Sequence, residues 1–160
     1  MLEIRAVEEK DRIWVKKVLE NLWGSEEIVY NGQIFHAAEI PGFIAFEKDR
    51  PLGLLTYVIN AEDKECQIIS LNSLMPGIGI GTSLIEKIKV EAKKALCERL
   101  FVVTTNDNLN ALKFYQKRGF VFKEVRPNEV ERSRQLRPSI SIIGEEGLPI
   151  RDELELEMGL

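Results

Sequence analysis

The chain has 160 residues, of which 44% are hydrophobic and 30% charged, and its formal net charge is −4. This composition is typical of a soluble globular domain, and a chain of this length can bury a core without disulfides or metals. The acidic balance disfavours a nucleic-acid-binding protein, because such binding depends on neutralising phosphates. No apolar run reaches the ~18 residues of a membrane span, and the N-terminus lacks signal-peptide character. We therefore expect a cytoplasmic protein with no nucleic-acid or membrane partner.

The cysteine and histidine content excludes several classes of catalytic and metal site. Cys66 and Cys97 are too few for a disulfide framework or a four-thiolate zinc site, and we expect two buried, reduced thiols. His36 is the only histidine, which excludes HExxH zincins and all-histidine metal sites. No G-x-S-x-G elbow is present, so a serine-hydrolase triad has no support. We predict no metal, and we favour a surface or packing role for His36 over a catalytic one.

Hydrophobic periodicity predicts an antiparallel meander in the first half of the chain. Alternation predicts a strand at residues 2–7, and apolar residues every four positions predict a helix at 8–23 that ends at Gly24. The segment 25–41 is ambiguous, because residues 26–30 could form a short helix and Asn31-Gly32 is a turn signal. Consecutive strands joined by polar turns favour antiparallel pairing, and we expect them at 43–46, 52–59 and 65–73.

After residue 73 the pattern changes to alternating helices and strands. A glycine-rich segment leads into a long amphipathic helix, and a strand at 100–104 and a helix at 108–117 follow. A strand at 120–125 precedes a helix-loop extension around 128–152, where Asn128 and Glu131 have capping-box spacing. Residues 153–158 predict the last strand, with the leucines facing one way and the glutamates the other. We predict a single α/β domain over residues 1–160 with a mixed sheet.

The sequence P-G-I-G-I-G-T at residues 76–82 is a candidate anion site. Glycines allow positive φ and a close approach to a ligand, and the first amides of a helix favour a pyrophosphate. The segment is not a Walker loop, because no Lys-Ser/Thr follows the glycines. It is a poor dinucleotide fingerprint, because Thr82 stands at the third glycine position and no acidic residue ends the next strand. A structural tight turn explains the glycines equally well.

A second segment resolves this ambiguity. Asn108 and Ala111 are followed by Phe114-Tyr115 and then by Gly119-Phe120. This resembles the N-x-x-A-x-x-x-Y-x-x-x-G-F pattern of the GNAT superfamily of acyl-CoA N-acyltransferases, whose pyrophosphate-binding loop the upstream glycine segment also resembles. The order of elements matches too, so the resemblance covers nearly the whole chain. It implies a GNAT-like α/β fold, with a mostly antiparallel mixed sheet of about seven strands flanked by helices and splayed between the fourth and fifth strands.

The resemblance implies acetyl-CoA (coenzyme A) as the co-substrate and a definite set of binding residues. Backbone groups near Leu71 and Ser73 would hydrogen-bond the pantetheine arm. Asn108 would reach polar groups of the cofactor, and Tyr115 would lie near the sulfur. Pro76 departs from the family pattern, which often has Gln or Arg there, so a side-chain contribution to phosphate binding is missing. Backbone amides would hold the pyrophosphate, from Ile78, Gly79, Ile80, Gly81 and Thr82.

The reaction that the resemblance implies is transfer of an acetyl group to a primary amine by direct attack on the thioester. An amine with a pKa of ~10 is protonated at pH 7, so it must lose a proton first. A backbone N–H on the fourth strand could stabilise the oxyanion, and Tyr115 is the expected proton donor to the leaving thiolate. Glu65 is the candidate base. Glu39 and His36 lie in the region that usually shapes the acceptor pocket, and a water relay without an essential base is equally plausible.

The sequence leaves the amine acceptor and the oligomeric state open. Acidic residues of the extension, namely Glu145, Glu146, Asp152 and Glu153, could attract a cationic acceptor or only keep a hairpin soluble. A homodimer is an open alternative, because dimers are frequent in the resembled superfamily. The alternative function is a non-catalytic acyl-CoA-binding or interaction module of the same fold, which would bind acetyl-CoA without releasing CoA to any amine.

Overall fold

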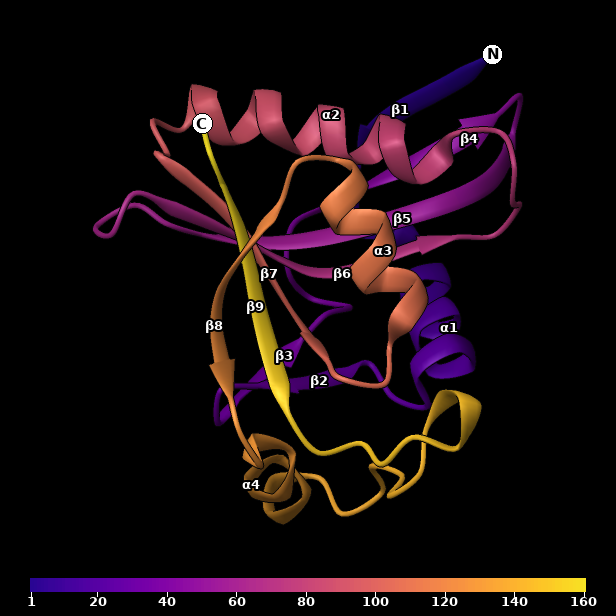
Figure 1. The fold of residues 1–160 in the computed structure, drawn as a ribbon. Coiled ribbons are helices and arrows are strands. Elements are labelled where there is room, and N and C mark those ends of the chain that lie inside the picture. The colour runs from indigo at the N-terminus through magenta and orange to yellow at the C-terminus, as the bar shows by residue number, and fades with distance from the viewer. The chain divides into compact units, whose positions relative to one another are not determined.

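The computed structural model describes residues 1–160 and has an α/β fold built on a seven-stranded mixed sheet. The strand order is β1-β4-β5-β6-β7-β9-β8, and β2 and β3 form a separate two-stranded sheet (Figure 1). The strands of the large sheet are β1 (Leu2–Ala6), β4 (Gly42–Glu47), β5 (Arg50–Asn60), β6 (Glu65–Ser73), β7 (Arg99–Thr105), β8 (Val121–Arg126) and β9 (Glu153–Gly159). The other elements are α1 (Arg12–Trp23), β2 (Glu27–Tyr30), β3 (Gln33–His36), α2 (Ile80–Lys94), α3 (Leu109–Lys117) and α4 (Glu129–Leu136).

The chain divides into two compact units. The first comprises residues 1–28, 36–100 and 160, and the second comprises residues 29–35 and 101–159. In the first unit β1, β4, β5 and β6 pair antiparallel in that order, which confirms the predicted meander. No helix of the protein is long and apolar enough to cross a membrane.

Two helices cover opposite faces of the meander in the first unit. Gly53 of β5 lies directly under α2, because a Cβ built there would overlap the side chain of Ile80 and touch that of Leu84. The next position along β5 faces the other way and pairs with Asn72, whose Oδ1 accepts a hydrogen bond from Trp23 Nε1 of α1 at 2.9 Å. Helix α1 ends as predicted at Gly24, whose φ of 78° suits glycine.

The apolar faces of these helices and strands form the core of the first unit. Burial of each such side chain stabilises the fold by about 1.5–3 kcal/mol, so this core fixes where α2 begins and ends. The side chains that are fully or almost fully buried include Leu19, Ile44, Leu54, Leu55, Ile68, Leu84, Ile85 and Ile88.

The second unit contains β8 and β9 as an antiparallel pair, with α3 before β8 and α4 between β8 and β9 in the sequence. Helices were predicted in both places, and both are confirmed. The predicted capping box at Asn128 is wrong, because its side chain does not cap α4 and its φ is 57°. The backbone N–H of Asn128 instead donates to Asp152 Oδ1 at 2.7 Å, so a distant carboxylate fixes the entry to the helix.

The structure corrects the expectation of a short helix at residues 26–30. This stretch is strand β2, which pairs with β3 through the turn at Asn31 and Gly32, with φ of 49° and 72°. Ile28, Val29 and Tyr30 are all buried, and consecutive burial of β-branched and aromatic residues favours a strand. The turn signal was right, but the helical interpretation ignored it.

Replacement of Gly53 tests the close packing of α2. We expect Gly53→Ala to lower the free energy of unfolding by about 1–3 kcal/mol, because Ile80 must move to admit the new methyl group. Gly159→Ala is the matched control, since a Cβ there meets nothing within 4 Å, and it should change stability by less than about 0.5 kcal/mol. Urea unfolding measures both, and equal effects would contradict the packing argument.

Candidate active site

The backbone N–H and C=O groups of strand β6 point alternately toward its two edges. The Leu74 N–H donates to the Leu52 carbonyl of β5 at 2.8 Å, and hydrogen-bonded pairs alternate along an antiparallel ladder. The backbone groups of Leu71 and Ser73 therefore point away from β5, toward the other edge of β6. An extended ligand on that edge could pair with them as an added strand does.

A β-bulge in β6 changes which side chains share a face. Thr56 pairs with Ser70 and Tyr57 with Ile68, so Ile69 is an extra residue without a partner in β5. The interpretation that Glu65 shares a face with Leu71 and Ser73 is therefore wrong, since one inserted residue reverses the alternation.

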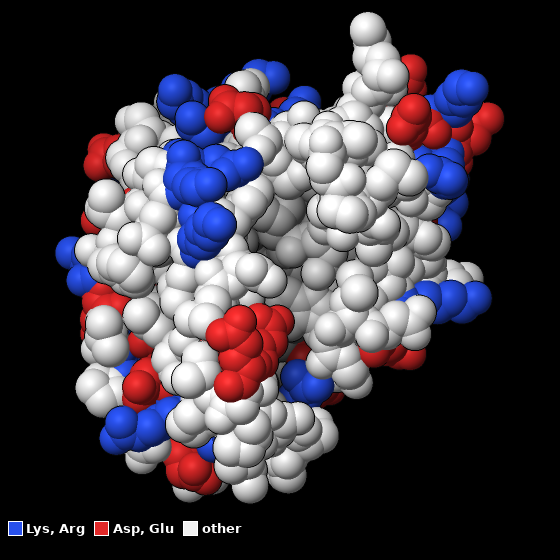
Figure 2. All heavy atoms as spheres, turned by 45° about the vertical axis from the view of Figure 1, so that its right-hand side comes forward, with Lys and Arg blue, Asp and Glu red and all other residues white.

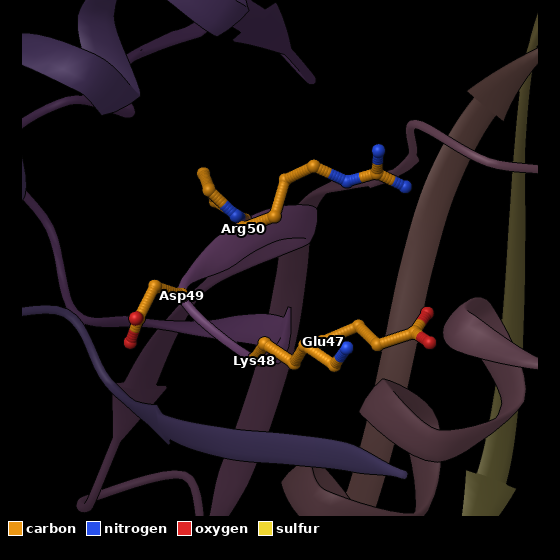
Figure 3. Close-up of a pocket in the computed structure, with 5 residues that line it drawn as sticks. Glu47, Lys48, Asp49 and Arg50 are labelled. Atoms are coloured by element: carbon orange, nitrogen blue, oxygen red, sulfur yellow. The ribbon is translucent and has the colours of Figure 1, made fainter.

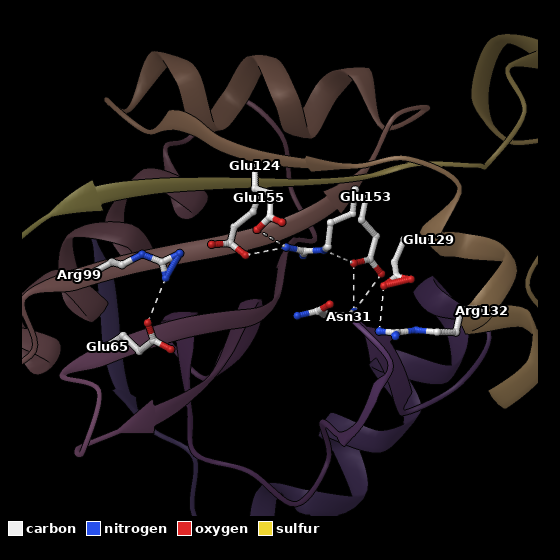
Figure 4. A network of polar contacts seen from close by, with 9 residues as sticks. Asn31, Glu65, Arg99, Glu124, Glu129, Arg132, Glu153 and Glu155 are labelled. Atoms are coloured by element: carbon white, nitrogen blue, oxygen red, sulfur yellow. Dashed lines mark hydrogen bonds and ion pairs between the residues drawn. The ribbon is translucent and has the colours of Figure 1, made fainter.

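The candidate base Glu65 is already engaged by a cation. Its Oε2 lies 3.1 Å from Nη1 of Arg99, and both side chains are largely covered (Figure 4). The contact occupies one carboxylate oxygen and holds the side chain against the guanidinium. This contact weakens the case for Glu65 as the general base.

The loop after β6 leads into α2, whose N-cap residue makes no side-chain hydrogen bond to the first amides. Gly79 is the N-cap residue of α2, with φ of 76°, and it supplies no side-chain acceptor to the first amides. Gly77 also has a positive φ of 87°, and a Cβ at either glycine meets nothing within 4 Å. The side chain of Ile80 is buried while that of Ile78 is exposed. The backbone at the start of α2 is thus open to an anion, which the helix dipole favours.

The β4–β5 turn brings a basic side chain beside this loop. Arg50 Nη2 lies 4.0 Å from Met75 Sδ, next to Pro76. Arg50 also lines a concavity of about 600 Å³ with Glu47, Lys48 and Asp49, and Figure 3 shows Asp49 pointing away from Arg50. The charges of this lining balance, so we assign it no chemistry of its own.

Tyr115 lies in the buried part of α3, in the second unit. Its ring makes edge-to-face contacts with Phe114 and Phe120, with centroids 5.3 Å away in each case. Burial raises the pKa of Tyr115 well above its usual value, so the phenol is protonated at neutral pH. A protonated, fixed phenol is able to donate a proton, and the same ring also packs the unit.

Asn108 acts as the N-cap of α3. Its Oδ1 accepts from Ala111 N–H at 3.4 Å, and its Nδ2 donates to Thr104 Oγ1 at 3.2 Å. Both side-chain groups thus have partners in the same unit, and the cap accounts for this residue without a ligand. Its predicted contact with the cofactor stays a prediction.

The extension between α4 and β9 is fixed by polar contacts within the second unit. Arg134 donates to the carbonyls of Ser141 and Ile150 at 2.8 and 2.6 Å, and Asn106 Nδ2 donates to Pro149 O at 2.9 Å. Glu145 and Glu146 are exposed at its turn. These two carboxylates are therefore presented by an anchored loop.

Glu153 and Glu155 of β9 are buried, contrary to the idea that Glu153 attracts an acceptor. Arg126 Nε lies 3.2 Å from Glu153, and Nη1 lies 3.0 Å from Glu155 (Figure 4). The backbone N–H of Asn31 also donates to Glu153 at 3.0 Å. Burial raises the pKa of Glu153 despite these partners. We conclude that Glu153 holds β8, β9 and the β2–β3 turn together.

Two further predictions about residue chemistry can be compared with the structure. Cys66 and Cys97 are buried free thiols, as expected, and burial raises the pKa of Cys66 to about 12, so its thiol is not a nucleophile at neutral pH.

On the face drawn in Figure 2, Lys and Arg occur in separate groups among uncharged and acidic residues. That face lacks the continuous basic surface typical of nucleic-acid binding.

Comparison with known proteins decides the family. The model of the acetyltransferase (GNAT) family matches residues 8–120. The chain belongs to the GNAT acetyltransferase family. It is 45% identical over 133 residues to the uncharacterised protein YdhI of Bacillus subtilis (strain 168), with 82% of each chain covered.

Solved structures share the fold of this GNAT protein. An IAA acetyltransferase from Bacillus cereus ATCC 14579 is 21% identical, with a TM-score of 0.77 over 100% of both chains. A GNAT family acetyltransferase from Elizabethkingia anophelis, solved with acetyl-CoA bound, is 18% identical, with a TM-score of 0.70 over 99% of this chain and 98% of that one. The predicted GNAT-like α/β fold is therefore confirmed.

Sequence reasoning missed two polar clusters of this GNAT protein. One is the Arg126 network, which joins residues from three separate segments. The other is a hydrogen-bonded pair of Glu26 and His36, with 3.2 Å between Oε1 and Nδ1. The sequence offered one signal for this second cluster: two glutamates precede the hairpin turn, and the single histidine follows it. The possible helix at residues 26–30 hid the hairpin that brings them together.

Removal of Arg126 tests the buried network. We expect Arg126→Met to lower the free energy of unfolding by about 3–5 kcal/mol at pH 7, because Glu153 and Glu155 then remain buried without their cation. Since the pKa of Glu153 is raised, the folded protein binds its proton more readily than the unfolded chain, and the deficit should shrink as the pH falls from 7 to 5.

Chemical denaturation at the two pH values measures this effect. The matched control is Arg132→Met, which removes an exposed ion pair with Glu129 in the same unit and should cost less than about 1 kcal/mol. A pH-independent deficit for Arg126→Met would show that lost packing, and not the unpaired carboxylates, causes the instability.

Proposed function

We propose that this protein is an N-acetyltransferase that moves an acetyl group from acetyl-CoA to a primary amine. The observation that carries the proposal is the uncapped start of α2, which belongs to the same compact unit as the end of β6, where the backbone groups of Leu71 and Ser73 point away from β5. The acetyl-CoA-bound structure with the same fold supports this cofactor. We also propose that residues 1–160 act as one cytoplasmic acetyltransferase domain, and a homodimer remains an alternative to a monomer.

Backbone groups would do most of the work of cofactor binding. The pantetheine amides would pair with Leu71 and Ser73, whose backbone groups point away from β5. The pyrophosphate would accept hydrogen bonds from the amides of residues 78–82, where glycines leave the approach open. Arg50 would add positive charge beside the loop, in place of the side chain that Pro76 lacks.

The chemistry then requires removal of two protons from the acceptor ammonium group, protonation of the departing thiolate and stabilisation of one oxyanion. The neutral amine attacks the thioester carbon, and a backbone N–H of β6, such as that of Leu71, would donate to the oxyanion. The C–S bond then breaks, and Tyr115 would protonate the departing thiolate. Tyr115 is a candidate for this role because a phenol is protonated at neutral pH and its ring is held in place by Phe114 and Phe120.

The contacts in the structure do not favour Glu65, the candidate base from the sequence. Glu65 is paired with Arg99, so a water relay or another base would accept the proton of the amine. The exposed Glu145 and Glu146 are candidates for attracting a cationic acceptor. A non-catalytic acyl-CoA-binding module would share the binding residues but would show no turnover.

Titration of the purified protein with acetyl-CoA, with NADH as the control ligand, tests the binding site. We expect Gly79→Glu to raise the Kd for acetyl-CoA at least ~10-fold, because its carboxylate would stand where the pyrophosphate binds. Gly147→Glu is the matched control, since Gly147 also has a positive φ, of 75°, with nothing within 4 Å of a Cβ. Equal losses, or none, would contradict the assigned loop.

Substitution of Tyr115 tests catalysis separately from binding. We expect Tyr115→Phe to lower kcat by about 100-fold, because general acid catalysis typically contributes at least that factor. The Kd for acetyl-CoA should change little, since the ring and its contacts with Phe114 and Phe120 are kept. The assay follows CoA release with a panel of primary amines. Wild-type protein that binds acetyl-CoA but acetylates no amine would favour the non-catalytic module.

A further inference from the structure

The Glu26–His36 pair is built like the base of a catalytic dyad. The Nδ1 of His36 lies 3.2 Å from Oε1 of Glu26. The second oxygen of Glu26 accepts from Ala38 N–H at 3.4 Å, and its backbone carbonyl accepts from Ala37 N–H at 2.9 Å. Glu26 is thus held at both its backbone and its carboxylate, and it fixes the orientation of the imidazole.

This arrangement leaves the outer nitrogen of the ring available. The His36 side chain is 49% exposed, whereas that of Glu26 is 18% exposed. When Nδ1–H donates to the carboxylate, Nε2 carries the lone pair, and it has no hydrogen-bond partner in the protein. An oriented imidazole with an accessible Nε2 is the usual form of a general base.

The pair and the strand proposed to bind the pantetheine arm belong to the same compact unit and are linked through the end of α1. Trp23 at the end of α1 donates its indole N–H to Asn72, which stands between Leu71 and Ser73. Glu26 follows Trp23 by three residues, a span of at most about 11 Å. The α1 contact therefore connects the pair to the part of β6 where the thioester would lie.

The surroundings of the imidazole are acidic. One carboxylate oxygen each of Glu26 and Glu27 and one imidazole nitrogen of His36 all lie within 4.8 Å of one another. Glu26, Glu27 and Glu39 together raise the pKa of His36 above its usual value, with the hydrogen bond from Glu26 contributing most. The raised pKa makes the imidazole a stronger proton acceptor than a free one, and the carboxylates attract an ammonium group.

We propose that His36, oriented by Glu26, is the general base that deprotonates the acceptor ammonium group; this assignment rests on the proposed acetyl transfer. The ammonium loses one proton to Nε2, and the neutral amine forms the C–N bond while the thioester carbonyl becomes an oxyanion. When the C–S bond breaks, Tyr115 protonates the departing thiolate, and the second proton of the acceptor nitrogen restores the phenol by way of water. The imidazolium returns its proton to water. Glu26 is a positioning residue, because it acts through the ring of His36.

Two nucleophiles with different needs for a base test the assignment. n-Butylamine is protonated at pH 7 and requires deprotonation, whereas hydroxylamine is largely neutral there. We expect His36→Gln to lower kcat/KM for n-butylamine by about 100-fold and to leave transfer to hydroxylamine within about twofold. Assays contain a chelator, and acetyl-CoA binding and the thermal midpoint of each variant confirm that it is folded.

The pH dependence of acetyl transfer distinguishes the orienting role of Glu26 from a general effect of the negative surface charge. Transfer to n-butylamine should rise with pH through the pKa of His36. Glu26→Gln should move this rise to lower pH and reduce kcat about tenfold, because it removes the largest cause of the raised pKa. Glu62→Gln removes an equal charge at the exposed β5–β6 turn, outside the groups that raise the pKa of His36, and it should change kcat less than about twofold.

The single histidine gives an independent measurement that needs no variant. The imidazole NMR signals of His36 are unique in the chain, so their titration gives its pKa directly. This pKa should coincide with the midpoint of the kinetic rise in the wild-type enzyme. A mismatch, or an equal loss of transfer to both nucleophiles in His36→Gln, would overturn the role of His36. Absence of wild-type transfer to either nucleophile would overturn the proposed function itself.

Discussion

The close contact between α2 and β5 fixes the geometry on which the rest of the site depends. Gly53 has no side chain, so Ile80 can lie directly on the strand and the first turn of α2 stands over the end of β6. A larger residue would lift the helix start and separate it from the backbone edge of Leu71 and Ser73. One missing methyl group thus brings the proposed anion-binding helix start and the proposed binding edge together within one compact unit.

This arrangement makes backbone groups the main ligand-binding elements of the proposed site. Main-chain amides keep their positions whatever side chains surround them, provided that the loop can adopt positive φ, as Gly77 and Gly79 allow. The loss of a side-chain donor at Pro76 therefore removes one contact and leaves the basic design intact. The neighbouring Arg50 shows how a residue from another turn can approach the same loop.

Local periodicity accounts for what the sequence predicted correctly. The meander, α2, α3 and the last strand each carry their pattern within one continuous segment. The roles of the glycine loop and Tyr115 rest on the family resemblance and stay predictions. The errors all involve contacts between distant segments. The bulge at Ile69 reverses a face without any change in composition, and Glu153 is buried because Arg126 and Asn31 meet it from elsewhere.

The same reasoning explains why the base of the reaction could not be found from the sequence. Glu26 and His36 are ten positions apart and meet only because β2 and β3 pair around the turn at Asn31 and Gly32. Neither residue is distinctive alone, and an exposed histidine is usually a surface residue. Its chemistry arises from the hairpin, which orients the ring on one side and leaves the other accessible. The acceptor side of the site therefore depends on tertiary pairing, whereas the cofactor side depends on a local loop motif.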